Sequence, residues 1–201
     1  PSTSTLAPRT LRPRELPLAV RGARVRKSDV ITFADVEAAR KRIAGSIFLS
    51  PCAYSESLSK LTGTRCWLKL ENLQMTGSFK ERGACNRLTM LTAEERARGV
   101  ICASAGNHAQ GVAYHATRLS VVAASLKNKA TPIIKVQSTR GFGARVILHG
   151  GSYDEAYEEA LRLQKEENRV FVHPFDDELV MAGQGTIGLE LLEQNPYLEA
   201  V

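Results

Sequence analysis

The sequence has no stretch of about 18 consecutive apolar residues, the length that a membrane-spanning helix needs. We therefore expect no membrane contact. Cysteine is also scarce, and the four cysteines form no CxxC pair and have no HxxxH partner; they are Cys52, Cys66, Cys85 and Cys102. The common zinc and redox-dithiol patterns are thus missing. We expect no metal site, and reduced thiols that are mostly buried.

Acidic residues are few at the start of the chain. Residues 1–30 hold seven Lys and Arg against Glu15 and Asp29, so they carry +5 of the net charge of +6 and leave +1 for the rest. A nucleic-acid surface needs basic and aromatic side chains on folded elements, so we expect no nucleic-acid partner. A segment rich in Arg, Ser, Thr and Pro predicts either a transit peptide or a disordered leader. The location would then be an organelle or the cytoplasm.

The sequence also lacks a Walker A loop, an HExxH pair and a GxSxG elbow. One stretch, Gly183-Gln184-Gly185-Thr186-Ile187-Gly188, matches GxGxxG. No convincing strand leads into it, and the acidic residue that a dinucleotide site requires about 20 positions later would lie beyond Val201. We interpret these glycines as a place where a helix packs closely on a sheet.

Helix-like and strand-like segments alternate from Thr32 onward. Thr32 and Asp35 form a capping pair, and Gly45 ends the first helix. The later segments are predicted in this order: strand 66–70, a helix capped by Ser78 and Glu81 with Lys80 in its first turn, strand 100–103, helix 107–119, strand 121–126, a helix with Thr131 as cap and Pro132 at its first position, strand 145–148, a helix from Ser152 and strand 170–172. This alternation predicts a mainly parallel sheet covered on both faces, which is an α/β fold.

Lys80 is the first candidate for chemistry. A lysine in the first turn of a helix meets the positive end of the helix dipole, and partial burial beside Phe79 also disfavours the ammonium form. A neutral, nucleophilic amine is what imine formation with an aldehyde cofactor requires. Spacing alone favours the alternative, a solvated surface lysine.

The second candidate is the loop Ser104-Ala105-Gly106-Asn107-His108, between a predicted strand and a predicted helix. Its small residues leave several backbone N–H groups free to bind a carboxylate or phosphate, and Asn107 could donate a hydrogen bond to an anionic ring oxygen. The alternative is an ordinary turn with Asn107 as cap and His108 as a packing or capping residue.

These two stretches together resemble motifs of the fold-type-II pyridoxal-phosphate enzymes, and specifically of the threonine and serine dehydratases (threonine ammonia-lyases). The first motif is Gly77-Ser78-Phe79-Lys80 and the second is Ser104 to His108. Supporting stretches follow in the family's order: Thr131-Pro132 with Lys135-Val136, Arg140 to Ala144, Pro174 to Asp177, and Ala182 to Thr186. The resemblance covers about residues 31–201 and implies a three-layer α/β fold with a parallel sheet, of the tryptophan synthase β type.

The resemblance implies pyridoxal 5'-phosphate as cofactor and Lys80 as its Schiff-base lysine. Phe79 would lie against the pyridine ring, and Asn107 would donate to the ring oxygen. The carboxylate of a small amino-acid substrate would bind at Ser104, Ala105, Gly106, Asn107 and His108. The implied reaction is β-elimination, in which freed Lys80 removes the α-proton, giving 2-oxobutanoate from L-threonine or pyruvate from L-serine, plus ammonia. The family resemblance also implies a homo-oligomer.

The resemblance further implies a division of the chain. Residues 1–30 would be the leader, residues 31–101 plus 179–201 a partial large cofactor-binding domain, and residues 102–178 an inserted small domain. The family's glycine-rich phosphate loop would follow Val201, so the large domain would be incomplete. We expect the 201 residues alone to bind cofactor weakly and to turn over poorly.

Two departures from the family pattern bear on function. Residues Ala124 to Ala130 replace a strand end that usually contains Met-Pro. Ala105 stands where serine racemases of the family place a proton-transferring serine, which favours elimination over racemisation. Two alternatives remain open: a serine racemase, and a truncated non-catalytic relative that acts through subunit association.

Overall fold

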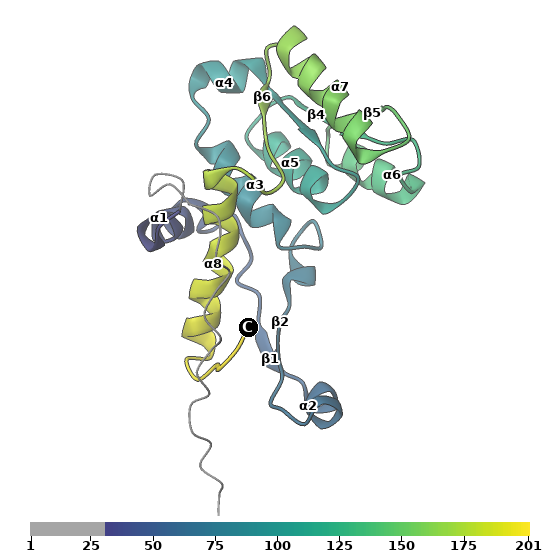
Figure 1. Ribbon diagram of the computed structural model, residues 1–201. Coiled ribbons are helices and arrows are strands. Elements are labelled where there is room, and N and C mark those ends of the chain that lie inside the picture. Colours follow the sequence, from purple (N-terminus) through teal and green to yellow (C-terminus); the bar gives the residue numbers. More distant parts are fainter. Residues whose placement is uncertain (1–30) are drawn as a thin grey trace, which may run out of the picture. The chain divides into compact units, whose positions relative to one another are not determined.

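The computed structural model describes residues 31–201, which form one unit of the chain (Figure 1). The expectations for residues 1–30 lie outside this range. The elements are α1 (Phe33–Ile43), β1 (Cys52–Tyr54), α2 (Glu56–Thr62), β2 (Trp67–Lys69), the 3-10 helix η1 (Glu71–Leu73), α3 (Lys80–Thr89), α4 (Ala93–Arg98), β3 (Val100–Ala103), α5 (Asn107–Arg118), β4 (Ala123–Lys127), α6 (Ile133–Gly141), β5 (Arg145–Leu148), α7 (Tyr153–Glu166), β6 (Val170–Phe171) and α8 (Glu178–Gln194). None of the helices in residues 31–201 has the length and apolar character to cross a membrane.

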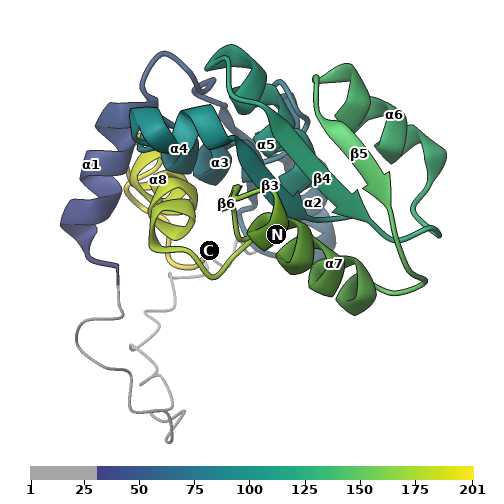
Figure 2. The same cartoon turned by 90° about the horizontal axis from the view of Figure 1, so that it is seen from above.

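A parallel sheet with the strand order β5-β4-β3-β6 forms the centre of this unit. Successive side chains of a strand point to opposite faces, and β3 is buried on both. Val100 and Cys102 belong to one apolar cluster with residues of α3 and α5. Ile101 and Ala103 belong to a second cluster with residues of α7. Figure 2 shows α5 and α7 on opposite sides of the sheet, so the predicted three-layer α/β arrangement is confirmed.

Helices α1, α3 and α8 pack against one another beside the sheet (Figure 1). Two glycines allow the close approach of α3 and α8: a Cβ atom on Gly183 would lie 2.7 Å from the Arg82 carbonyl oxygen and 2.7 Å from Gly83 Cα. The stretch 183–188 is therefore part of α8 and no dinucleotide loop. Our interpretation was wrong in one respect, because α8 packs closely here on a helix rather than on a sheet.

The predicted helix caps are partly wrong. The capping box of Thr32 and Asp35 is present. Thr131, by contrast, does not cap α6: the cap position is Pro132, and the Thr131 hydroxyl bonds to Asn128 Oδ1 instead. Helix α3 begins at Lys80, so Lys80 does lie in the first turn. Glu81, however, accepts a hydrogen bond from the N–H of Thr76 at 2.8 Å instead of pairing with Ser78.

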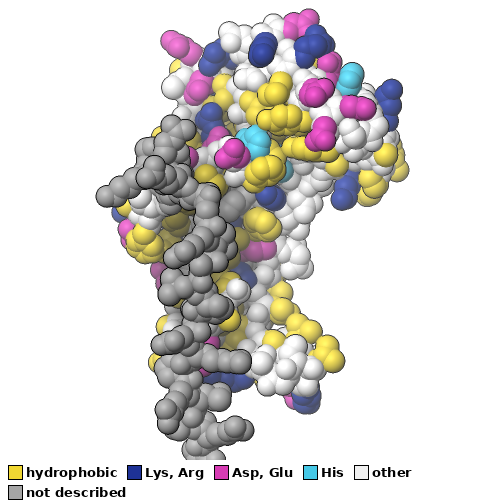
Figure 3. Space-filling model, viewed as in Figure 1, with side chains coloured by type: hydrophobic (Ala, Val, Ile, Leu, Met, Phe, Trp, Pro, Cys, Tyr) yellow, Lys and Arg dark blue, Asp and Glu magenta, His cyan; other side chains and the backbone are white. Residues whose placement is uncertain are grey.

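Strands β1 and β2 form a separate antiparallel pair. This pair and α2 leave several large apolar side chains exposed, namely Tyr54, Leu58, Leu61, Trp67 and Leu68. Figure 3 shows hydrophobic side chains gathered at this end on the face that it presents. The described residues therefore bury their apolar side chains mainly around the sheet and α3, away from this pair.

The contact between α3 and α8 predicts opposite effects for two glycines of one helix. Gly183→Ala should lower the free energy of unfolding by about 1–3 kcal/mol, since its Cβ would overlap backbone atoms. In Gly188→Ala the added Cβ atom would have no other atom within 4 Å. This substitution should leave the free energy of unfolding unchanged or raise it by up to about 1 kcal/mol. Denaturant unfolding measures both. Equal values for the two variants would contradict this account of the helix contact.

Candidate active site

The residues predicted from the two motifs come together where the sheet meets α3. Helix α5 begins just after β3, and α3 packs against it. A Cβ atom on Gly111 of α5 would lie 3.3 Å from the Lys80 carbonyl oxygen. The segment after β6 reaches the same place, because the Lys80 amine donates a 2.8 Å hydrogen bond to the Pro174 carbonyl. Three stretches far apart in the sequence thus meet at Lys80.

The surroundings of the Lys80 amine disfavour its charged form. It is partly buried, and burial lowers the pKa of its ammonium group below the ordinary value of 10.5. Its hydrogen-bond partner among residues 31–201 is a carbonyl and not a carboxylate, so no ion pair stabilises the charged form. The amine lies 5.5 Å from the centre of the half-exposed Phe79 ring. The alternative of a fully solvated surface lysine is therefore wrong for this position.

The loop from Ser104 to Asn107 is held by its neighbours in a shape that exposes N–H groups. The Ser104 N–H donates to the Leu126 carbonyl at 3.0 Å, and the Gly106 N–H donates to Ser104 Oγ at 3.2 Å. The first N–H groups of α5, beginning at Asn107, have no acceptor within the helix. The Asn107 side chain is exposed and makes no hydrogen bond within the described residues. This loop can bind a small anion.

His108 is a buried, neutral residue. Burial lowers its pKa to about 4, which outweighs the opposing hydrogen bond with Val172. Its Nε2 atom donates to the Val172 carbonyl at 3.0 Å, so Nδ1 carries no proton; within residues 31–201, Nδ1 has no hydrogen-bond partner. The side chain ties α5 to the end of β6. This geometry agrees with the packing role that the residue type alone favoured.

A buried ion network that the motifs did not reveal supports the start of α3. The Arg82 guanidinium, fully buried, contacts Glu71 at 2.8 Å and Glu190 at 2.7 Å. Lys69 also contacts Glu190, at 2.6 Å. Burial alone would lower the pKa of Arg82, but the two carboxylates raise it above its usual range. Only the position of Arg82, two residues after Lys80, could have drawn attention to it in the sequence.

Lys127 is a second residue near the site that was not predicted. It ends β4, its side chain is 1% exposed, and its amine donates a 2.9 Å hydrogen bond to the Ser104 carbonyl. Burial lowers the pKa of this amine to about 8. The sequence did give a signal, because a lysine stands within the strand end that departs from the family pattern.

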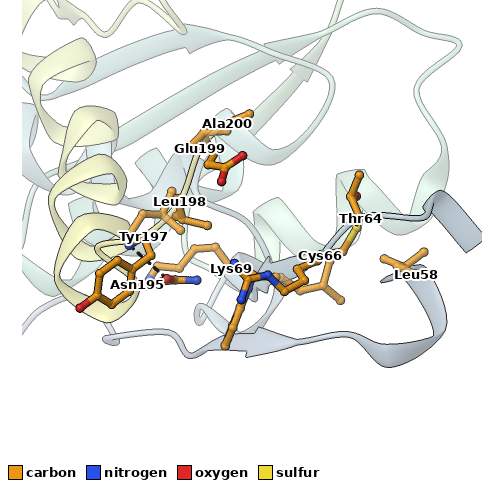
Figure 4. A pocket seen from close by; sticks show the side chains of 14 residues that line it. Leu58, Thr64, Cys66, Lys69, Asn195, Tyr197, Leu198, Glu199 and Ala200 are labelled. Atoms are coloured by element: carbon orange, nitrogen blue, oxygen red, sulfur yellow. Dashed lines mark hydrogen bonds between the residues drawn. The ribbon is translucent and has the colours of Figure 1, made fainter. Parts of the chain in front are cut away.

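A pocket of about 780 Å³ lies elsewhere, between β2 and residues 195–201 (Figure 4). Its lining includes Cys66, Lys69, Tyr197 and Leu198, and none of the residues that the motifs predicted. Among residues 31–201, no group of three or more His, Cys, Asp and Glu side chains is arranged to hold a metal ion. The residues predicted from the motifs therefore lie outside this pocket.

The network around Arg82 predicts a large loss of stability on its removal. Arg82→Met leaves Glu71 without its ion-pair partner and Glu190 with Lys69 alone, and we expect the free energy of unfolding to fall by about 3–5 kcal/mol. The matched control is Arg40→Met, which breaks a solvent-exposed pair between Arg40 of α1 and Glu193 of α8 and should cost about 1 kcal/mol or less. Chemical denaturation of both variants would test this; similar costs would contradict it.

His108 predicts a loss of stability in acid. Its pKa is lower in the folded chain (about 4) than in the unfolded chain (about 6.5). The unfolded state therefore binds more protons between these values, so stability falls as pH falls from about 6.5 to about 4, by roughly 3 kcal/mol from this residue. Unfolding free energies measured across this range should fall less steeply in His108→Gln. Equal pH slopes in the two proteins would show that His108 is not buried as described.

Comparison with known proteins agrees with the two motifs. Residues 43–201 match the family described as pyridoxal-phosphate dependent enzyme. The chain is 50% identical over 172 residues to the L-threonine ammonia-lyase of Thermotoga maritima, covering 86% of this chain and 43% of that protein. It is 46% identical over 165 residues to the catabolic L-threonine dehydratase TdcB of Staphylococcus aureus, covering 82% of this chain and 48% of that protein.

Two solved structures show the same fold. The processed form of threonine deaminase isoform 2 from Solanum lycopersicum has a TM-score of 0.74 and 40% identity, covering 84% of this chain and 45% of that one. Serine racemase from Dictyostelium discoideum has a TM-score of 0.76 and 35% identity, covering 85% of this chain and 55% of that one. The chain spans about half the length of the relatives that it matches.

Proposed function

The chain belongs to the pyridoxal-phosphate dependent enzyme family, and we propose that it is the part of an L-threonine ammonia-lyase that carries the cofactor-binding lysine, Lys80. One observation carries the proposal. The Lys80 amine is partly buried, has a lowered pKa and meets a carbonyl instead of a carboxylate. The names of the relatives, threonine ammonia-lyase and threonine dehydratase, support the choice of reaction.

The side chains around Lys80 fit pyridoxal phosphate. A lowered pKa gives the amine a larger neutral fraction, and the neutral amine is the form that attacks an aldehyde. The exposed face of Phe79 is close enough to Lys80 to lie against a pyridine ring. The amide of Asn107 can donate a hydrogen bond to a ring oxygen without introducing a charge that would compete with Lys80.

When bound, pyridoxal phosphate supplies the electron sink that stabilises negative charge at the substrate α-carbon. The loop of Ser104, Ala105, Gly106, Asn107 and His108 would bind the substrate carboxylate through its N–H groups and so orient the α-proton. Lys80 Nζ, once the substrate amino group has displaced it, would take that proton. The β-hydroxyl would leave as water, and hydrolysis of the imine of the product would then release ammonia with 2-oxobutanoate from L-threonine or pyruvate from L-serine.

A serine racemase is the second candidate, because such an enzyme is among the structural neighbours. Racemisation needs a second proton-transfer group on the opposite face of the α-carbon, and the residue at the family's serine position is Ala105, whose methyl group cannot transfer a proton. This favours the lyase. Chiral analysis of serine and assay of 2-oxo acids after incubation with L-serine would separate the two activities.

Reductive trapping tests the role of Lys80 directly. After incubation of the chain with pyridoxal phosphate and reduction with borohydride, peptide mapping by mass spectrometry should find the label on Lys80. Lys80→Ala should reduce specific labelling at least about tenfold, since it removes the attacking amine. Lys60→Ala, which changes an exposed lysine, should leave the label on Lys80 unchanged.

Two results would count against the proposal. Label spread over exposed lysines without preference for Lys80 would contradict the assignment of the cofactor site. Co-purification with a longer homologue, without labelling of Lys80, would instead support the truncated relative that acts through subunit association. The expectation that the 201 residues alone turn over poorly stays a prediction, and near-native formation of 2-oxobutanoate would refute it.

We also propose the organisation that the family resemblance implied. Residues 102–178 would form the inserted small domain, with residues 31–101 and 179–201 in the large one. The packing of α7 on β3, β4 and β6, which lie within or at the edge of residues 102–178, supports this division. A homo-oligomer and a leader at residues 1–30 complete the proposal. Analytical ultracentrifugation and the location of a fusion carrying residues 1–30 would test them.

A further inference from the structure

Lys127 lies directly behind the loop that would bind the substrate carboxylate. A buried ammonium group is costly unless its surroundings compensate for the lost water. Lys127 is 1% exposed, and its amine has one hydrogen-bond acceptor among residues 31–201, the Ser104 carbonyl at 2.9 Å. The residue stands in the strand end where this chain departs from the family pattern. Because burying this ammonium group costs free energy, we expect the residue to serve a function.

The hydrogen bond from Lys127 to the Ser104 carbonyl fixes the direction of the next N–H group, that of Ala105. In a planar trans peptide the C=O of one residue and the N–H of the next point in opposite directions. Because the Ser104 C=O points at Lys127, the N–H of Ala105 points away from it. This N–H forms no hydrogen bond with any other residue in the described part of the chain. It is free to donate to a carboxylate on the ligand side of the loop.

Positive charge also surrounds this peptide. A charge-assisted hydrogen bond to a C=O polarises the peptide unit and strengthens its N–H as a donor. The amine of Lys135, from α6, lies 3.8 Å from the position of a Cβ atom on Gly106. The other titratable group that faces Lys127 is the Cys102 thiol of β3, whose pKa burial raises to about 11, so it is neutral at pH 7.

We propose that Lys127 is a positioning residue of the carboxylate site: its ammonium group holds the Ser104–Ala105 peptide so that the Ala105 N–H faces the bound carboxylate, and its charge increases the affinity of the loop for that anion. This inference rests on the proposed function, which places the substrate carboxylate at this loop. Neutral Lys127 holds the peptide less firmly and adds no charge. The affinity for carboxylates should therefore fall as Lys127 loses its proton.

Acetate, added at constant ionic strength with chloride as the control anion, is a suitable probe because it carries a carboxylate and no amine. The amide resonances of Ala105 and Asn107 in the ¹⁵N-labelled chain at pH 7 report its binding without cofactor or turnover. We expect Lys127→Met, which keeps the length of the side chain, to weaken acetate binding about fivefold or more. The control Lys129→Met, on the exposed part of the same stretch, should bind acetate as the unaltered chain does.

A second measurement uses the unaltered chain, so it does not require any variant to fold. If protonated Lys127 favours the anion, the anion must in turn raise the pKa of Lys127, by linkage. Titration of the lysine ¹³Cε resonances, with and without acetate, should show this increase at Lys127. Equal acetate affinity in Lys127→Met, or an unchanged Lys127 pKa, would overturn the proposal and leave the role of Lys80 untouched. Absence of acetate binding in the unaltered chain would overturn the carboxylate site itself, whereas trapping at Lys80 is a separate result.

Discussion

One buried guanidinium group holds the parts of the chain on which the site depends. Arg82 connects α3 to η1 and to α8 through Glu71 and Glu190, and Lys69 completes a set of two positive and two negative side chains. Buried charges are tolerated only when all are paired, so these four side chains require one another. Lys80 begins the same helix two residues earlier. The position of its amine therefore depends on a network that the amine does not join.

The other half of the site depends on the sheet. Strands β3 and β4 end side by side, and the loop from Ser104 follows β3 while Lys127 ends β4. Helix α5 then packs on the start of α3 at Gly111, where a Cβ atom would lie 3.2 Å from Glu81 Cα. The loop from Ser104 and the helix that begins at Lys80 are thus joined through backbone contacts. Small residues at these contacts allow two helices to bring two different chemical groups to one place.

The sequence predicted most of this arrangement. The alternation of segments indicated the parallel α/β sheet, and two short motifs located Lys80 and the loop of Ser104 to His108. It could not predict Thr131 or Glu81 correctly, because their side chains bond to residues outside the local capping patterns. It could not show that Gly183 packs on Gly83 or that Arg82 meets Glu190, since those pairs lie about 100 residues apart. Such contacts exist only once the chain has folded.

The ionisation of the Lys80 amine is the property on which the proposed chemistry depends most directly. It can be measured by the rate at which each lysine reacts with a small acylating reagent as a function of pH, resolved by peptide mass spectrometry. We expect Lys80 to titrate below its ordinary pKa of 10.5, since burial without an acidic partner disfavours the ammonium form. A Lys80 amine that titrates at or above the ordinary value would contradict its assignment as the cofactor-binding nucleophile.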